Sequence, residues 1–174
     1  MVPGSHTPFG TQGSRWLTLG VTYAPDLEAA TDVAIFASLG TFVVNDFEVL
    51  ADLALWYFAQ PGKDAVGINP GLNLRWHALG THRNPERGDG ATWSLFLDAG
   101  VGVLLSSANV PDGGTGLNFT PKAGVGITWR PAPARPIYIA GLRWHHISNA
   151  RINGDTRNPD RDAPGFYAGV SFGF

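Results

Sequence analysis

The chain has 174 residues, enough for one domain, and its formal net charge of −2 disfavours nucleic acid as a partner. It contains no cysteine, which excludes a disulfide framework and thiolate metal sites. Only 15% of its residues are charged while 23 are glycine, a balance that favours a membrane β-barrel over a soluble globule. No apolar run reaches 18 residues, so we expect no transmembrane helix.

The N-terminal residues 1–6 have neither the basic start nor the apolar core of a signal peptide. We interpret them as a tag left on a mature sequence. Residues 1–13 are therefore expected to be an N-terminal extension, either a tag or a flexible segment. Residues 14–174 are expected to form a single outer-membrane β-barrel domain.

Alternation of apolar with polar or small residues dominates the rest of the chain and predicts an all-β fold. We expect eight strands, near residues 14–24, 31–43, 48–57, 66–78, 93–105, 117–130, 136–149 and 165–174. Several exceed ten residues, about the length with which a tilted strand crosses a bilayer. The sequence thus predicts an eight-stranded antiparallel transmembrane β-barrel.

A soluble barrel or sandwich would also alternate, but with its apolar residues inside. Here the polar face combines glycines with charges of both signs, which can pair in the narrow lumen of an eight-stranded barrel. These charged residues are Glu48, Asp52, Arg75, Asp98, Lys122, Arg130 and Arg143. The apolar face is bulky and begins or ends in tryptophan and tyrosine, as an aromatic girdle at a membrane interface would.

The last strand ends on Phe174, and a terminal aromatic residue is usual for bacterial outer-membrane barrels, although an ordinary edge strand could end in the same way. An even strand number places both termini on one side, normally the periplasm. The connection 149–164 is then extracellular and the longest on that side. The connection 80–92 should be a short periplasmic turn, yet its length does not fit that expectation.

A histidine and a serine stand at the outer end of the seventh predicted strand. His146 and Ser148 are two residues apart, so a strand directs both side chains to one face, the same face as Trp144. Histidine can act as a general base for a serine nucleophile. If this face meets lipid, the pair lies at the membrane surface.

Such a pair also requires an orienting carboxylate and an oxyanion donor. Counting back from Phe166 gives Asp162 the outward parity, so we expect it to be the acid, with Asp160 and Asp155 as alternatives. Asn149 could donate its side-chain amide to an oxyanion, together with a backbone N–H of residue 150 or 151. The three aspartates do not have EF-hand spacing, so no metal or other cofactor is expected, although a calcium site is left open.

The segment His146-Ile147-Ser148-Asn149-Ala150 resembles the His-x-Ser-Asn-Ala signature of PagL-type lipid A 3-O-deacylases. Four further stretches are similar to that family: 74–77, 118–126, 143–145 and 158–159. The resemblance covers roughly residues 48–174. It implies an outer-membrane barrel that hydrolyses the acyl chain ester-linked at position 3 of lipid A.

By this resemblance His146 is the base, Ser148 the nucleophile and Asn149 an oxyanion contributor. Relatives can carry glutamate as the acid, whereas this loop offers only aspartates. Lipopolysaccharide and outer-membrane lipids are the implied partners, the active site would face the outer leaflet, and a homodimer is left open. Two other functions remain: a non-enzymatic structural or adhesive barrel, and a phospholipase or acyltransferase using the same pair.

Overall fold

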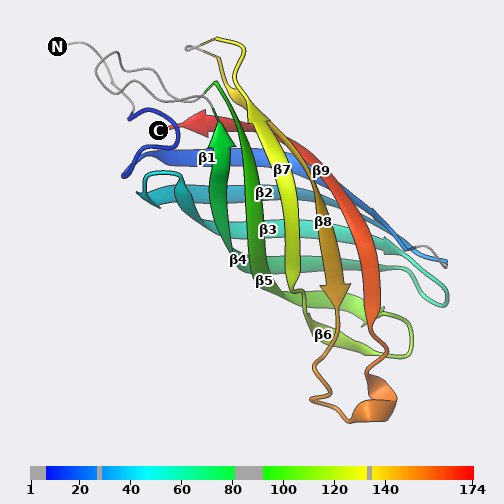
Figure 1. The fold of residues 1–174 in the computed structure, drawn as a ribbon. Coiled ribbons are helices and arrows are strands. Elements are labelled where there is room, and N and C mark those ends of the chain that lie inside the picture. Colours follow the sequence, from blue (N-terminus) through cyan, green and yellow to red (C-terminus); the bar gives the residue numbers. More distant parts are fainter. Residues whose placement is uncertain (1–6, 27–28, 81–91, 133–134) are drawn as a thin grey trace.

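The computed structural model describes residues 7–26, 29–80, 92–132 and 135–174, which form a closed antiparallel β-barrel (Figure 1). Its strands are β1 (Arg15–Pro25), β2 (Thr31–Val44), β3 (Phe47–Ala59), β4 (Ala65–Gly80), β5 (Trp93–Val110), β6 (Thr115–Phe119), β7 (Lys122–Trp129), β8 (Ile137–Ile147) and β9 (Arg161–Gly173). Consecutive strands pair, except that β6 and β7 both pair with β5, and β9 closes the barrel against β1.

The nine segments make eight barrel strands, as predicted, because β6 and β7 are two parts of one strand that both pair with β5. The break falls at Thr120 and Pro121. Pro121 has no backbone N–H to give to the ladder, while Thr120 still exchanges backbone hydrogen bonds with Gly102. The prediction of an eight-stranded antiparallel barrel is therefore confirmed, with one interruption that alternation did not reveal.

Most of the charges predicted for the lumen are paired there, while the Arg130 guanidinium lies over the Trp16 ring. Asp98 lies between two guanidinium groups, 2.7 Å from Arg143 Nη2 and 3.3 Å from Arg75 Nη2. A second pair joins Lys122 Nζ to Asp52 at 2.8 Å. Such charges remain inside only when they are paired, so the pairs explain how a narrow lumen tolerates them.

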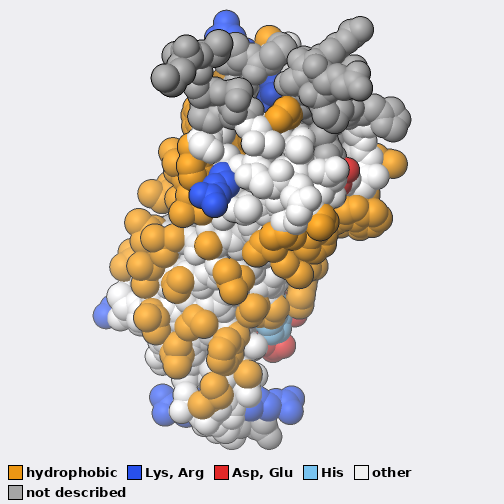
Figure 2. All heavy atoms as spheres, turned by 90° about the vertical axis from the view of Figure 1, so that its left-hand side faces the viewer, with side chains coloured by type: hydrophobic (Ala, Val, Ile, Leu, Met, Phe, Trp, Pro, Cys, Tyr) orange, Lys and Arg blue, Asp and Glu red, His pale blue; other side chains and the backbone are white. Residues whose placement is uncertain are grey.

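Large apolar side chains cover the outside, as Figure 2 shows for one face. Leu72, Ile35 and Leu142 are each more than half exposed, although a protein in water would bury them. Their exposure fits a wall that faces lipid. Within the described residues, no helix is long and apolar enough to cross a membrane.

The described N-terminal residues, from residue 7 on, and the C-terminus lie at one end of the barrel, opposite the loop between β8 and β9 (Figure 1). Residues 7–13, expected to form an extension, fold over that end. Phe9 is buried in edge-to-face contact with Trp16 and Phe42. Residues 1–6 lie outside the described residues, as do residues 81–91, which make up most of the long connection between β4 and β5.

Candidate active site

His146 and Asp162 face each other across the last two strands, at the end of the barrel that carries the β8–β9 loop. They are directly opposed in the antiparallel register of β8 and β9. His146 Nδ1 lies 2.9 Å from Asp162 Oδ1. A carboxylate can only accept, so the Nδ1–H donates to it and the Nε2 lone pair remains available. This is the tautomer that a general base requires.

The inward neighbours of His146 fix its outward direction. His145 stacks on Trp56 inside the barrel, with ring centroids 4.8 Å apart and an interplanar angle of 15°. Ile147 is completely buried in the apolar cluster at this end of the lumen. Because successive strand residues alternate sides, these two buried anchors hold the His146 imidazole on the outer face.

Asp162 is held in the same way by Arg161. The Arg161 guanidinium is buried, where Nη1 donates to Asp32 Oδ1 and Nη2 to Gln60 Oε1, each at 2.7 Å. These bonds connect the start of β9 to β2 and to the residue that follows β3. The carboxylate of Asp162 therefore points outward, where its side chain is 55% exposed.

Ser148 follows β8 and continues the outward parity of His146. Its backbone exchanges two hydrogen bonds with Phe119, Ser148 N–H to Phe119 O at 3.1 Å and Phe119 N–H to Ser148 O at 2.7 Å. Two residues along a strand span about 7 Å, within which the two side chains can meet. Among the described residues, the Ser148 hydroxyl makes no hydrogen bond, to His146 included, so the contact between nucleophile and base stays a prediction.

Asn149 holds the loop that follows. Its buried amide Nδ2 donates to the Arg157 carbonyl at 2.6 Å and to Thr115 Oγ1 at 3.1 Å, while its Oδ1 accepts the Arg151 N–H at 2.9 Å. The predicted role of this amide as an oxyanion donor stays a prediction, and it requires one of these bonds to be released.

The Ala150 N–H is the unbonded one of the two backbone donors next to Ser148 among the described residues. Of the two backbone donors suggested by the sequence, the Arg151 N–H is already bonded to Asn149, whereas that of Ala150 bonds to no described residue. Ala150 and Arg151 have φ of 52° and 60°. This left-handed backbone costs about 1 kcal/mol or more per non-glycine residue, and strain of this kind gathers at functional sites.

Asp160 stands beside the pair. His146, Asp160 and Asp162 each offer one metal-ligating atom, and these atoms lie within 4.8 Å of one another. The Asp162 oxygen bonded to His146 also accepts the Trp144 indole N–H, so its lone pairs are already engaged by hydrogen-bond donors. The role of this carboxylate in orienting the imidazole stays a prediction, with which the hydrogen bond from Nδ1 agrees. The described structure does not place the Asp155 side chain.

Trp144 is the site residue that sequence reasoning missed. Its indole Nε1–H donates to Asp162 Oδ1 at 2.6 Å, and its ring lies 5.4 Å from that of His146. Its outward parity, two residues before His146, was visible in the sequence. The contact with Asp162 was not, because it crosses diagonally between two strands.

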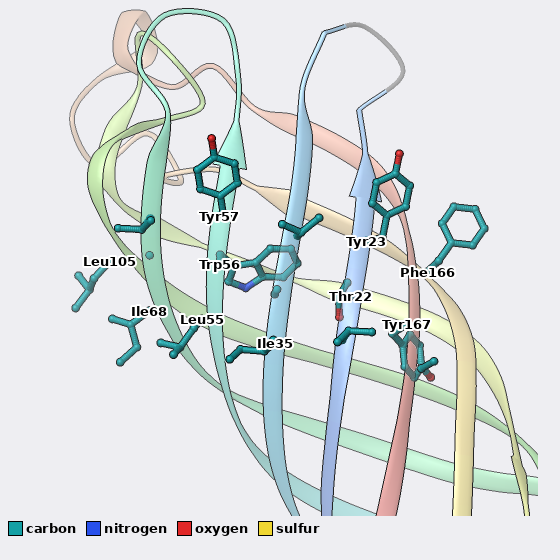
Figure 3. A pocket seen from close by; sticks show the side chains of 16 residues that line it. Thr22, Tyr23, Ile35, Leu55, Trp56, Tyr57, Ile68, Leu105, Phe166 and Tyr167 are labelled. Carbon is teal, nitrogen blue, oxygen red and sulfur yellow. The ribbon is translucent and has the colours of Figure 1, made fainter.

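A large hollow in the described barrel wall does not include this site. It is an apolar groove on the outer wall, lined by Tyr23, Ile35, Leu55, Tyr57 and Phe166 among others (Figure 3). It contains none of the candidate catalytic residues. We interpret it as part of the lipid-facing wall.

Comparison with known proteins identifies the family. The model of the lipid A 3-O-deacylase (PagL) family matches residues 54–171. The crystal structure of the outer membrane enzyme PagL superposes with a TM-score of 0.67 at 15% identity, covering 88% of this chain and 98% of PagL. No curated protein sequence matches the chain.

The barrel shape is shared with other outer-membrane proteins. Neisserial surface protein A has a TM-score of 0.65 at 14% identity, covering 94% of this chain and 100% of its own. OprG from Pseudomonas aeruginosa has a TM-score of 0.59 at 11% identity, covering 95% of this chain and 98% of its own. These likenesses establish an outer-membrane fold but no activity, whereas the family match covers more than half of the chain. The chain belongs to the PagL lipid A 3-O-deacylase family.

Proposed function

We propose that the protein is an outer-membrane esterase that removes the acyl chain ester-linked at position 3 of lipid A. The observation that carries the proposal is the hydrogen bond between His146 and Asp162 on the outer face of the barrel, two residues from Ser148. Family membership supports the substrate class. The apolar wall beside the site supports it as well, because a lipid substrate can approach within the membrane plane.

In the proposed reaction, Ser148 Oγ attacks the ester carbonyl carbon while His146 Nε2 takes the hydroxyl proton. The Asp162 carboxylate stabilises the imidazolium that forms, and the Ala150 N–H supports the charged oxygen of the tetrahedral intermediate. Collapse breaks the bond to the sugar oxygen, which takes the proton from His146. Water, activated by the same imidazole, then releases the fatty acid and restores Ser148.

The site supports this chemistry at the outer leaflet. If both termini are periplasmic, as is normal for these barrels, the β8–β9 loop and the His146–Asp162 pair lie at the opposite, extracellular end (Figure 1). Lipid A occupies that leaflet. The ester would then meet Ser148 where the apolar wall gives way to polar loop residues.

Mass spectrometry of lipid A tests the proposal. Purified protein incubated with lipopolysaccharide in detergent should remove one 3-hydroxyacyl chain. Ser148→Ala should lower the rate by roughly 10³-fold or more. Ser107→Ala, at an exposed serine near the same end of the barrel on β5, is the matched control.

Heat-modifiable migration in gels should show that both variants fold. Unchanged lipid A with the wild-type protein in several detergents would contradict the proposal. Equal rates for Ser148→Ala and wild type would also contradict it. Phospholipid added to the assay reports the competing activity, because release of its acyl chains instead would indicate a phospholipase.

A further inference from the structure

Trp144 stands on the outer face of β8, at the position where a membrane barrel commonly has a girdle tryptophan. A girdle tryptophan normally keeps its indole N–H toward water or lipid headgroups. Here the N–H is directed at the protein instead, to Asp162 Oδ1 at 2.6 Å. Interface anchoring therefore does not explain the orientation of this indole.

The strand register explains how the indole reaches the carboxylate. Trp144 is opposite Pro164 on β9 and Ala123 on β7. Neither neighbour has a polar side chain, and the small Ala123 leaves room for the ring. Asp162 is the diagonal neighbour across the strand pair, within reach of a long aromatic side chain.

Asp162 depends on this contact because its own side chain is more than half exposed. An exposed carboxylate bonded only to His146 could rotate and exchange that bond for water. The indole N–H and the imidazole N–H both bond to the same oxygen, Oδ1. Two donors on one atom restrict the carboxylate to one orientation, and the tilted Trp144 ring, 5.4 Å from the imidazole, covers one side of the pair.

We propose that Trp144 is a positioning residue of the catalytic site, which holds Asp162 in the orientation that directs His146 toward Ser148. This inference rests on the proposed function. Trp144 acts through Asp162 and is not expected to contact the reacting ester. Its loss should lower kcat and leave the KM for lipopolysaccharide nearly unchanged.

Trp144→Phe is the test, because phenylalanine keeps an aromatic ring on the wall and removes only the donor. A hydrogen bond to a charged group is strong enough that kcat should fall by roughly tenfold. Trp129→Phe is the matched control, since Trp129 is similarly exposed on the outer face of β7 and packs on Tyr138. Its kcat should stay within about twofold of wild type.

The double variant separates positioning from a structural role. In Asp162→Asn the carboxylate is absent, so adding Trp144→Phe should produce no further loss of kcat. Effects that multiply would overturn the proposal, and so would a Trp144→Phe variant as fast as Trp129→Phe.

A spectroscopic measurement keeps this inference separable from the proposed function. In ¹⁵N-tryptophan-labelled barrel in micelles, the indole N–H resonance that Trp144→Phe removes should move in Asp162→Asn. A resonance that does not move would overturn the contact even if the enzyme is active. If the resonance moves in Asp162→Asn but the wild-type protein releases no fatty acid, the contact between Trp144 and Asp162 stands. The catalytic role of Trp144 and the proposed function are then both overturned.

Discussion

His145 and His146 are consecutive residues of one strand with opposite environments. His145 is buried in the lumen against Trp56, and its Nε2 has no hydrogen-bond partner among the described residues. His146 is on the outer face, bonded to Asp162. A single step along β8 thus separates a packing histidine from a candidate base, because strand parity assigns each side chain its surroundings.

Two aspartates, Asp98 in the lumen and Asp162 on the outer face, show the same contrast. Asp98 is enclosed by Arg75 and Arg143 and contributes to the integrity of the lumen. Asp162 is exposed and contacts only groups at the site, His146 and Trp144, among the described residues. Inner polar residues therefore stabilise the barrel, whereas the outer ones are free to serve chemistry.

The largest contrast is expected between the two histidines. His146→Ala should lower kcat by roughly 10³-fold or more, because the base is removed, and should barely change the free energy of unfolding. His145→Ala should lower the free energy of unfolding by about 2 kcal/mol through the lost stack and the cavity. Urea unfolding in micelles and lipid A hydrolysis per folded molecule measure both quantities. Equal loss of turnover in the two variants would contradict the division into a catalytic His146 and a packing His145.

The aspartates should give the next largest contrast. Asp162→Asn should lower kcat by roughly 10³-fold, since the useful imidazole tautomer is no longer enforced, with little change in stability. Asp98→Asn removes the carboxylate that Arg75 and Arg143 share, and Arg75 alone keeps a second partner, Glu48. It should lower the free energy of unfolding by about 3 kcal/mol. Turnover of its folded fraction should remain near that of wild type. A stable Asp98→Asn barrel would mean that the lumen network contributes little.

Most of the fold could be predicted because lipid outside and ion pairs inside impose the same two-residue period on every strand. The prediction of strand ends was less accurate beyond the part of the barrel that has lipid outside and ion pairs inside. β5 extends to Val110. The prediction ended this strand at residue 105, because Ser106 and Ser107 do not continue the apolar alternation. Phe9 gave no periodic signal either, since it enters the barrel end from a segment without strand pairing.

The candidate site, too, could be predicted from the sequence only in part. Parity placed Asp162 beside His146, because both residues lie on regular paired strands. It could not foresee that the buried Asn149 amide is bonded to Arg157 and Thr115, since that depends on how the loop folds back. Nor could it find the bond from Trp144, which depends on side-chain reach rather than strand register.

The smallest expected effect concerns Asp160, the second carboxylate near His146. Parity gives it the outward direction, and its ligand atom lies within 4.8 Å of those of His146 and Asp162, yet no hydrogen bond connects it to His146 among the described residues. At such a separation in water, a carboxylate stabilises an imidazolium by about 1 kcal/mol. Asp160→Asn should therefore lower kcat by roughly fivefold at most.

Comparison with Asp162→Asn in the same hydrolysis assay decides which carboxylate orients the base. A more severe loss in Asp160→Asn would mean that His146 Nδ1 turns to Asp160 when substrate is bound. Mild losses in both single variants, followed by a severe loss in the double variant, would show that either carboxylate can serve. If the double variant is mild as well, His146 and Ser148 act as a dyad, and the outer face needs only its histidine and serine for catalysis.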